Sequence, residues 1–72
     1  MNLCKIETKH ILSEREIDVL MEIMKGASNK EIAECLCISL ATVKSHIINI
    51  YSKFQVNNRV AAIETAKNLR IL

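Results

Sequence analysis

Three short segments of this 72-residue chain share one pattern, which is typical of helix starts. In each segment an apolar residue precedes a serine, and a second apolar residue follows four positions after the serine. A serine hydroxyl can accept a hydrogen bond from a free amide of the first helical turn, and the two apolar residues can pack together across that turn. The segments are Leu12-Ser13…Ile17, Ala27-Ser28…Ile32 and Ile38-Ser39…Val43. The pattern therefore predicts three helices, each beginning directly after its serine.

The three predicted starts differ in charge. The first two carry a glutamate three residues after the serine, which forms a capping box and places a carboxylate at the positive end of the helix dipole. The third start has Thr42 at that position, three residues after Ser39, so its first turn has no negative charge. This difference suits a helix end that approaches phosphate. The two capping boxes are Ser13 with Glu16 and Ser28 with Glu31.

Apolar residues at helical spacing extend these starts and predict a fourth helix near the end of the chain. Gly26 is suited to end the first helix, and residues 55–58 form a connector with Asn57 as the expected cap. The expected helices cover residues 14–25, 29–36, 40–54 and about 58–69. The side chains expected to face inward are Ile17, Leu20, Met21, Met24, Ile32, Ala33, Leu36, Val43, Ile47, Ile50, Tyr51, Phe54, Ala62, Ile63, Ala66 and Leu69.

The composition agrees with one small all-α domain. The chain has no proline and one glycine, so the tight turns of a β-sandwich have few sources. We expect a four-helix bundle over residues 12–70, with residues 1–11 as a tail or linker. Aromatic residues make up 3% of the chain, which disfavours a stacking surface for single-stranded nucleic acid. No apolar run approaches the roughly 20 residues of a membrane helix, and the N-terminus lacks a signal-peptide core, so a cytoplasmic protein with no membrane partner is expected.

Charge is distributed unevenly along the chain. Residues 1–38 carry five basic and seven acidic residues, a balance of −2, whereas residues 39–72 carry five basic residues and one acidic residue, a balance of +4. A basic half on a small helical protein indicates either a surface for a polyanion or a solvated, mildly basic surface. The charge balance alone does not decide between the two.

The second and third expected helices have the spacing of a helix-turn-helix. Three residues, 37–39, connect them; Ala33 is small enough for a close helix crossing, and Val43 can lock the third helix against the second. Many such motifs have glycine in the turn, and here Cys37 or a neighbour occupies that place. The outward side of the third helix carries small and polar residues, which can enter a DNA major groove. That side consists of Ala41, Lys44, Ser45, Ile48 and Asn49.

Several separately spaced motifs across residues 12–69 resemble one known family. They are Leu12-Ser13-Glu14-Arg15-Glu16, Val19-Leu20, Gly26, Ser28-Asn29-Lys30-Glu31-Ile32-Ala33, Ile38-Ser39, Thr42-Val43-Lys44-Ser45-His46, Ile50, Lys53 and Val56-Asn57-Asn58-Arg59 with Ala62. Together they look like the LuxR-type (GerE, NarL/FixJ) DNA-binding domain, a bacterial helix-turn-helix. Residues 46–54 and 66–72 are most similar to its MalT-like branch. Phe54-Gln55 departs from the usual Leu-Gly of the family.

The resemblance implies the DNA-binding output domain of a bacterial transcription regulator, with the third helix in the major groove of double-stranded DNA. By position it implies that Lys44, Ser45 and Ile48 face the bases. The chemistry of the side chains agrees, since lysine can donate to guanine and isoleucine can cover a thymine methyl, and Asn49 could pair with adenine. The residues placed for phosphate contacts are Lys30, Thr42, His46 and Lys53.

The resemblance also implies that the fourth helix serves for dimerisation. Its outward strip is short and mixed in character, well below the roughly 800 Å² per partner of a stable interface. We therefore expect a monomer or weak homodimer that pairs on DNA, with RNA polymerase as a further candidate partner. The strip consists of Val60, Ala61, Glu64 and Lys67.

Other interpretations of single residues stay open. His46 lies beside the core face and is as consistent with a packed histidine as with a phosphate contact. Exposed Ile48 needs no functional reason by itself. Arg59 is expected to be structural, pairing with Glu16 or Glu31. The three cysteines, Cys4, Cys35 and Cys37, are odd in number and lack the spacing of a zinc site, so we expect no metal and at least partly buried reduced thiols.

Competing functions come from two classes. The promoter-reading domain of sigma factors shares the first three helices, but the segment 56–66 argues against it. A small dimerising protein-interaction module, or an antagonist without useful DNA affinity, remains the alternative because the third helix has no arginine. No catalytic triad, paired carboxylates or phosphate-binding glycine loop is present, so no enzyme or cofactor is expected.

Overall fold

The computed structural model describes residues 12–69, which form four helices and no strand. The helices are α2 (Glu14–Met24), α3 (Asn29–Leu36), α4 (Leu40–Phe54) and α5 (Arg59–Asn68). This confirms the all-α fold and each expected helix to within about one residue of its bounds. The expected tail 1–11, with Cys4, lies outside the described residues, as do residues 70–72.

The helix starts form as the serine pattern predicts. The Ser13 hydroxyl accepts a hydrogen bond from the Glu16 amide at 3.2 Å, and Glu16 Oε1 accepts one from the Ser13 amide at 3.0 Å. The same reciprocal pair closes the start of α3. The expectation for α5 was wrong by one residue, because Asn58 caps this helix by accepting from the Ala61 amide at 2.8 Å.

Three helices also share one kind of ending. A residue just beyond the helix takes a left-handed backbone conformation, with φ of 90° at Gly26, 58° at Cys37 and 59° at Gln55. Gly26 lies two residues after the end of α2, whereas Cys37 and Gln55 directly follow α3 and α4. The amide of the next residue then donates to the carbonyl five residues before it, which is the Schellman motif. These next residues are Ala27, Ile38 and Val56, and all three pack against the core. Cys37 and Gln55 thus occupy positions that normally favour glycine.

Gln55→Gly should raise the free energy of unfolding by roughly 0.5–1 kcal/mol. A residue with a side chain is strained in the left-handed region by about 1–2 kcal/mol, and the greater freedom of glycine in the unfolded chain offsets part of this gain. Urea unfolding followed by circular dichroism would measure the change. Gln55→Ala keeps the strain and is the matched control; equal stability of the glycine and alanine variants would contradict this explanation.

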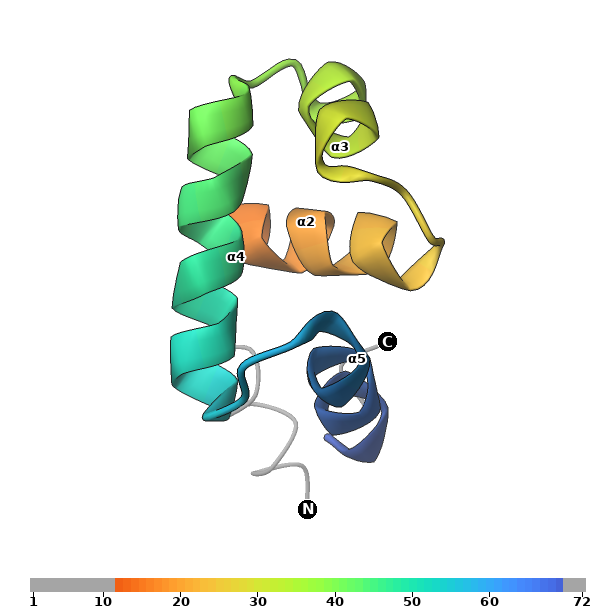
Figure 1. The fold of residues 1–72 in the computed structure, drawn as a ribbon, viewed down its shortest axis with the longest axis vertical. Helices are drawn as coiled ribbons and strands as arrows, with labels where there is room; N and C mark the ends of the chain where they lie inside the picture. Colours follow the sequence, from red (N-terminus) through yellow and green to blue (C-terminus); the bar gives the residue numbers. More distant parts are fainter. Residues whose placement is uncertain (1–11, 70–72) are drawn as a thin grey trace.

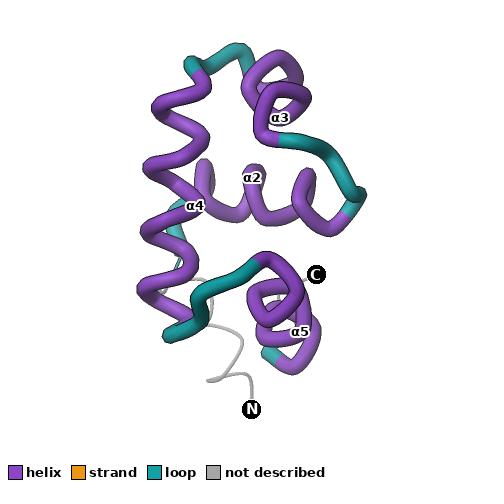
Figure 2. Tube along the Cα trace, in the orientation of Figure 1, coloured by secondary structure: helices purple, strands orange, loops and turns teal. Residues whose placement is uncertain are grey.

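The helices α2, α3 and α5 all pack on one side of α4 (Figure 1). Helix α2 crosses α4 near its middle, with α3 on one side of α2 and α5 on the other. The loop 37–39 joins α3 to α4 as the turn of a helix-turn-helix, and residues 55–58 lead back from α4 to α5 (Figure 2). The other side of α4 is left free of any described element.

The core lies where these helices meet. Its buried apolar side chains are Leu12, Val19, Leu20, Ile23, Ile32, Ala33, Val43, Ile47, Ile50, Phe54, Ala62 and Ala66. Ile17, Met24, Leu36, Tyr51 and Ile63 are partly buried against it, as expected for inward-facing side chains.

Two expected core residues are in fact exposed. Met21 lies on the outer side of α2, because the inward stripe of this helix is shifted by one residue and begins with Glu16. The apolar spacing did not predict this register, because the first inward residue of the helix is the charged Glu16. Leu69 follows the last turn of α5 and is exposed there.

Candidate nucleic-acid interface

Helix α4 has two distinct faces. Val43, Ile47, Ile50 and Phe54 are buried against the other helices. The expected outward residues are all exposed, and Ile48 has 65% of its surface open to solvent. The structure therefore brings the proposed base-contacting residues together on one free face of α4. These residues are Lys44, Ser45, Ile48 and Asn49.

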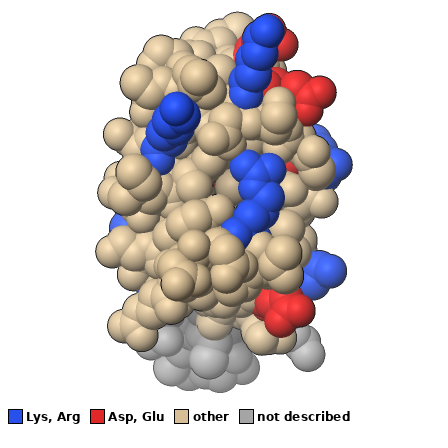
Figure 3. Space-filling model, viewed as in Figure 1, with Lys and Arg blue, Asp and Glu red and all other residues tan. Residues whose placement is uncertain are grey.

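This free face carries no negative charge. No Asp or Glu occurs in α4, and Lys44 forms no ion pair within the described residues. In Figure 3, Lys and Arg side chains are scattered over the visible face, on the α4 side, at the centre and along the opposite edge, while Asp and Glu lie at the top and along the edge away from α4. A duplex that approaches α4 would meet isolated basic groups rather than one continuous basic patch.

The candidate phosphate-contacting residues differ in their exposure to solvent and in their hydrogen bonds. Lys30 is exposed in the first turn of α3. Thr42 is half-buried in the first turn of α4, where its hydroxyl lies 2.8 Å from the Ser39 hydroxyl. His46 is half-buried, so its position is compatible with either of its two interpretations.

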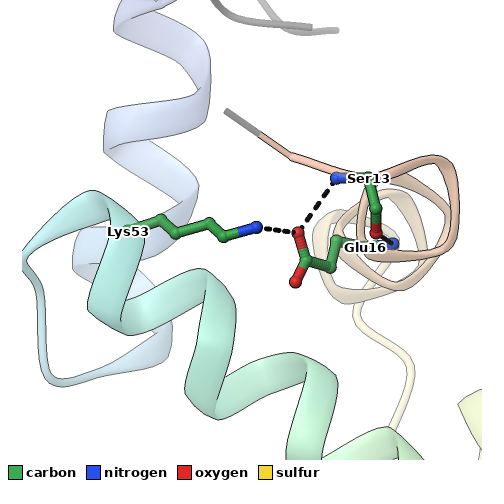
Figure 4. Close-up of polar contacts among 3 residues, drawn as sticks. All are labelled: Ser13, Glu16 and Lys53. Atoms are coloured by element: carbon green, nitrogen blue, oxygen red, sulfur yellow. Dashed lines mark hydrogen bonds and ion pairs between the residues drawn. The ribbon is translucent and has the colours of Figure 1, made fainter. Parts of the chain in front are cut away.

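Lys53 is held by a partner that the sequence did not reveal. Its Nζ donates to Glu16 Oε1 at 2.8 Å, and the same oxygen accepts from the Ser13 amide (Figure 4). Glu16 is the one charged side chain among residues 12–69 that is buried, with 4% of its surface exposed. The capping-box pattern predicts its bond to Ser13, but a lysine 37 residues away could not be recognised from spacing.

Burial acts to raise the pKa of Glu16, but the hydrogen bond from Lys53 and the one from the Ser13 amide outweigh it, so the pKa is lowered. The positive charge of Lys53 and, more weakly, His46 act in the same direction. The ionised carboxylate therefore stabilises the fold at pH values above its ordinary pKa, and this contribution is lost as the pH falls through the lowered value.

Arg59 is structural, as expected, but with other partners. Its guanidinium donates to the Ala27 carbonyl and to Asn29 Oδ1, both at 2.8 Å. It therefore fastens the start of α5 to the turn between α2 and α3, and it pairs with neither expected glutamate.

The cysteine expectation was partly wrong. Cys35 and Cys37 are free thiols but exposed, because Cys35 lies on the outer side of α3 and Cys37 in the turn. Among residues 12–69, no three His, Cys, Asp or Glu side chains are grouped so that they could hold a metal ion.

A family model described as bacterial regulatory proteins, luxR family, matches residues 10–66, which is most of the chain. The chain belongs to the LuxR family of bacterial regulatory proteins. Its helices α2 to α5 are therefore a LuxR-type DNA-binding domain with a helix-turn-helix. The match, together with the presence of α5, decides against a sigma-factor domain.

Two similar proteins are response regulators that are much longer than this chain. The nitrate/nitrite response regulator protein NarP of Escherichia coli (strain K12) is 56% identical over 52 residues, which are 72% of this chain and 24% of NarP. The response regulator protein VraR of Staphylococcus aureus (strain Mu3) is 44% identical over 59 residues, 82% of this chain and 28% of VraR.

The fold is also that of a solved LuxR-type regulator. The crystal structure of the response regulator ChrA, from a heme-sensing two-component system, matches with a TM-score of 0.82 and 49% identity. The match covers 85% of this chain and 30% of ChrA. The chain thus spans less than a third of the length of these relatives. In the part of the chain that the structure describes, no helix combines the length and apolar character needed to cross a bilayer.

Proposed function

We propose that the chain binds double-stranded DNA in a sequence-specific manner and regulates bacterial transcription, with α4 in the major groove. The observation that carries this proposal is the free face of α4, which is exposed and without acidic residues while the opposite face is buried in the core. An α-helix fits the major groove, and the second helix of a helix-turn-helix is the one that enters it. Such a regulator acts in the cytoplasm, on the chromosome, and needs no catalytic group.

Base recognition is assigned to four side chains of this face. Lys44 can donate to guanine O6 or N7, and Ile48 can cover a thymine methyl. Ser45 and Asn49 can hydrogen-bond to base edges, with adenine the natural partner of asparagine. The exposure of all four residues supports this assignment, because a base edge can be reached only by a side chain that the fold leaves free.

The phosphate contacts are assigned to residues around the free face, namely Lys30, Thr42, His46 and Lys53. Lys30→Ala should weaken binding to all duplexes alike and lower the salt slope by about one unit, because one phosphate contact carries no sequence information and releases about one counterion. Titration of two unrelated duplexes at several salt concentrations would measure both quantities. Loss of affinity for only one of the duplexes would instead place Lys30 among the base-contacting residues.

Dimerisation on DNA is assigned to the outward strip of α5. Val60 has 68% of its surface exposed, Glu64 and Lys67 are also exposed, and Ala61 is half-buried. A two-fold axis through this strip would place it against its own copy, with Glu64 and Lys67 in reach of each other. The strip is small, so the dimer should be weak in solution and form on paired half-sites one helical turn apart. RNA polymerase is a further proposed partner.

Val60→Glu should abolish cooperative binding to a double site and leave binding to a single half-site nearly unchanged. A buried glutamate at the two-fold axis would face its own copy and repel it. A gel titration with one-site and two-site duplexes, together with sedimentation, would measure the effect. Met21→Glu, an equal charge change at an exposed residue of α2, is the control. Cooperative filling by the Val60 variant would show that α5 is not the dimer surface.

The proposed function as a whole is tested by titrating the chain into random-sequence duplex DNA over a range of salt concentrations. A DNA-binding domain should bind, and log affinity should fall linearly with log salt. A protein-interaction module or antagonist would show no measurable affinity even at low salt, and that result would overturn the proposal.

A further inference from the structure

Lys53 is the lysine of α4 whose charge is already paired. Its Nζ lies 2.8 Å from Glu16 Oε1, while 40% of its side chain stays exposed at the C-terminal end of the helix. Lys44, on the same helix, has no such partner among the described residues. The two lysines of α4 are therefore not equivalent towards an approaching polyanion.

Glu16 cannot release Lys53 without a penalty. Its carboxylate is buried, and its other hydrogen-bond donor is the uncharged amide of Ser13. A buried carboxylate without a counter-charge is strongly unfavourable. A DNA phosphate must therefore compete with Glu16 for the ammonium or share it, since an ammonium has three N–H donors. In both cases the Glu16–Lys53 pair brings no net charge to the phosphate.

We propose that Glu16 is a positioning residue that limits the contribution of Lys53 to DNA binding. The inference rests on the proposed function, because it requires α4 to lie on a duplex. A lysine that is already ion-paired neutralises less phosphate charge and releases fewer counterions than a free one. Glu16 thereby weakens the sequence-independent part of binding and leaves a larger share to the base contacts of α4.

Glu16→Gln tests this inference with little change in shape. A glutamine can occupy the same place in a capping box, and its side-chain oxygen can still accept from Ser13 and Lys53, but the negative charge is gone. We expect affinity for duplexes of any sequence to rise about five- to tenfold at roughly 0.1 M salt, and the log–log salt slope to steepen by up to about 0.9.

Glu31→Gln is the matched control. Glu31 Oε1 accepts from the Ser28 amide at 2.8 Å in the capping box of α3, so the substitution makes the same change in the same motif. No described lysine pairs with Glu31. The affinity of the Glu31→Gln variant for duplex DNA should stay within about twofold of the original value, and its salt slope within about a few tenths. Equal gains in both variants would show a general charge effect and overturn the inference.

Lys53→Ala shows whether the effect of Glu16→Gln depends on Lys53. In the Glu16→Gln background, Lys53→Ala should return the affinity and the salt slope to those of the unchanged chain, and a gain that persists would overturn the inference, because Lys53 would not be its source. If Glu16→Gln binds duplex DNA no better than the unchanged chain, the inference fails while binding through α4 stands. If the unchanged chain binds no duplex at all, the proposed function fails together with the inference.

The unchanged chain gives an independent readout that does not depend on whether a variant folds. The carboxyl carbon resonance of Glu16 in NMR reports on the partner of that carboxylate. We expect this resonance to shift when duplex DNA binds, because the phosphate draws on the ammonium of Lys53. If the Glu16 resonance stays unchanged while the resonances of Lys44 shift on addition of DNA, the inference is overturned.

Discussion

Ile50→Ala is expected to lower the free energy of unfolding by about 2–5 kcal/mol, the usual loss when a large aliphatic core residue is truncated. Ile50 is 0% exposed and lies on the face of α4 that the other three helices cover. A chain of 72 residues has a small core, and its total stability is of the same order as this loss, so the variant should be largely unfolded near 37 °C. Thermal and urea unfolding followed by circular dichroism would measure the effect.

Ile48→Ala is the matched control for this prediction. The same substitution two residues earlier on the same helix removes a side chain that is 65% exposed. Its effect on stability should stay within about 0.5 kcal/mol, as for most surface substitutions. Similar losses at both positions would contradict the division of α4 into a buried and a free face.

Lys44→Ala and Ile48→Ala should each change which base is preferred at one position of the bound site, by about 1–3 kcal/mol. Lysine loses a hydrogen bond to guanine, and isoleucine loses its contact with a thymine methyl. Selection of bound sequences from a random duplex pool would measure the preferences of the original chain and of both variants.

Lys25→Ala is the control for this second prediction. Lys25 follows the last turn of α2, at the end of that helix farthest from α4 (Figure 1). Removing its charge can weaken binding slightly but should leave the selected sequence the same. An unchanged preference in the Lys44 and Ile48 variants would show that these residues do not read bases.

The sequence was most informative where local chemistry decides the structure. Helix starts depend on a serine and the residues within four positions of it, so all three serine caps and both capping boxes could be predicted. The two faces of α4 were also predictable, because its core residues keep a regular helical spacing and no charged residue interrupts it.

Contacts between distant segments could not be predicted. The inward stripe of α2 begins with Glu16, whose burial is compensated by the hydrogen bond from the Ser13 amide and by the ion pair with Lys53, a partner 37 residues away. Arg59 was expected to pair with a glutamate, but it donates to the Ala27 carbonyl and to Asn29. The contact with Ala27 could not be predicted, because every residue has a backbone carbonyl and the sequence does not show which one is used. Such pairings depend on how helices cross, which spacing along one helix does not specify.

The placement of α4 in the major groove is tested most directly by methylation interference on a duplex obtained by selection. Dimethyl sulfate methylates guanine N7, which lies in the major groove, and adenine N3, which lies in the minor groove. We expect methylation of guanines within the site to block binding, methylated adenines to have little effect, and Lys44→Ala to relieve the block at one guanine. Interference confined to adenine N3 would contradict the placement of α4 in the major groove.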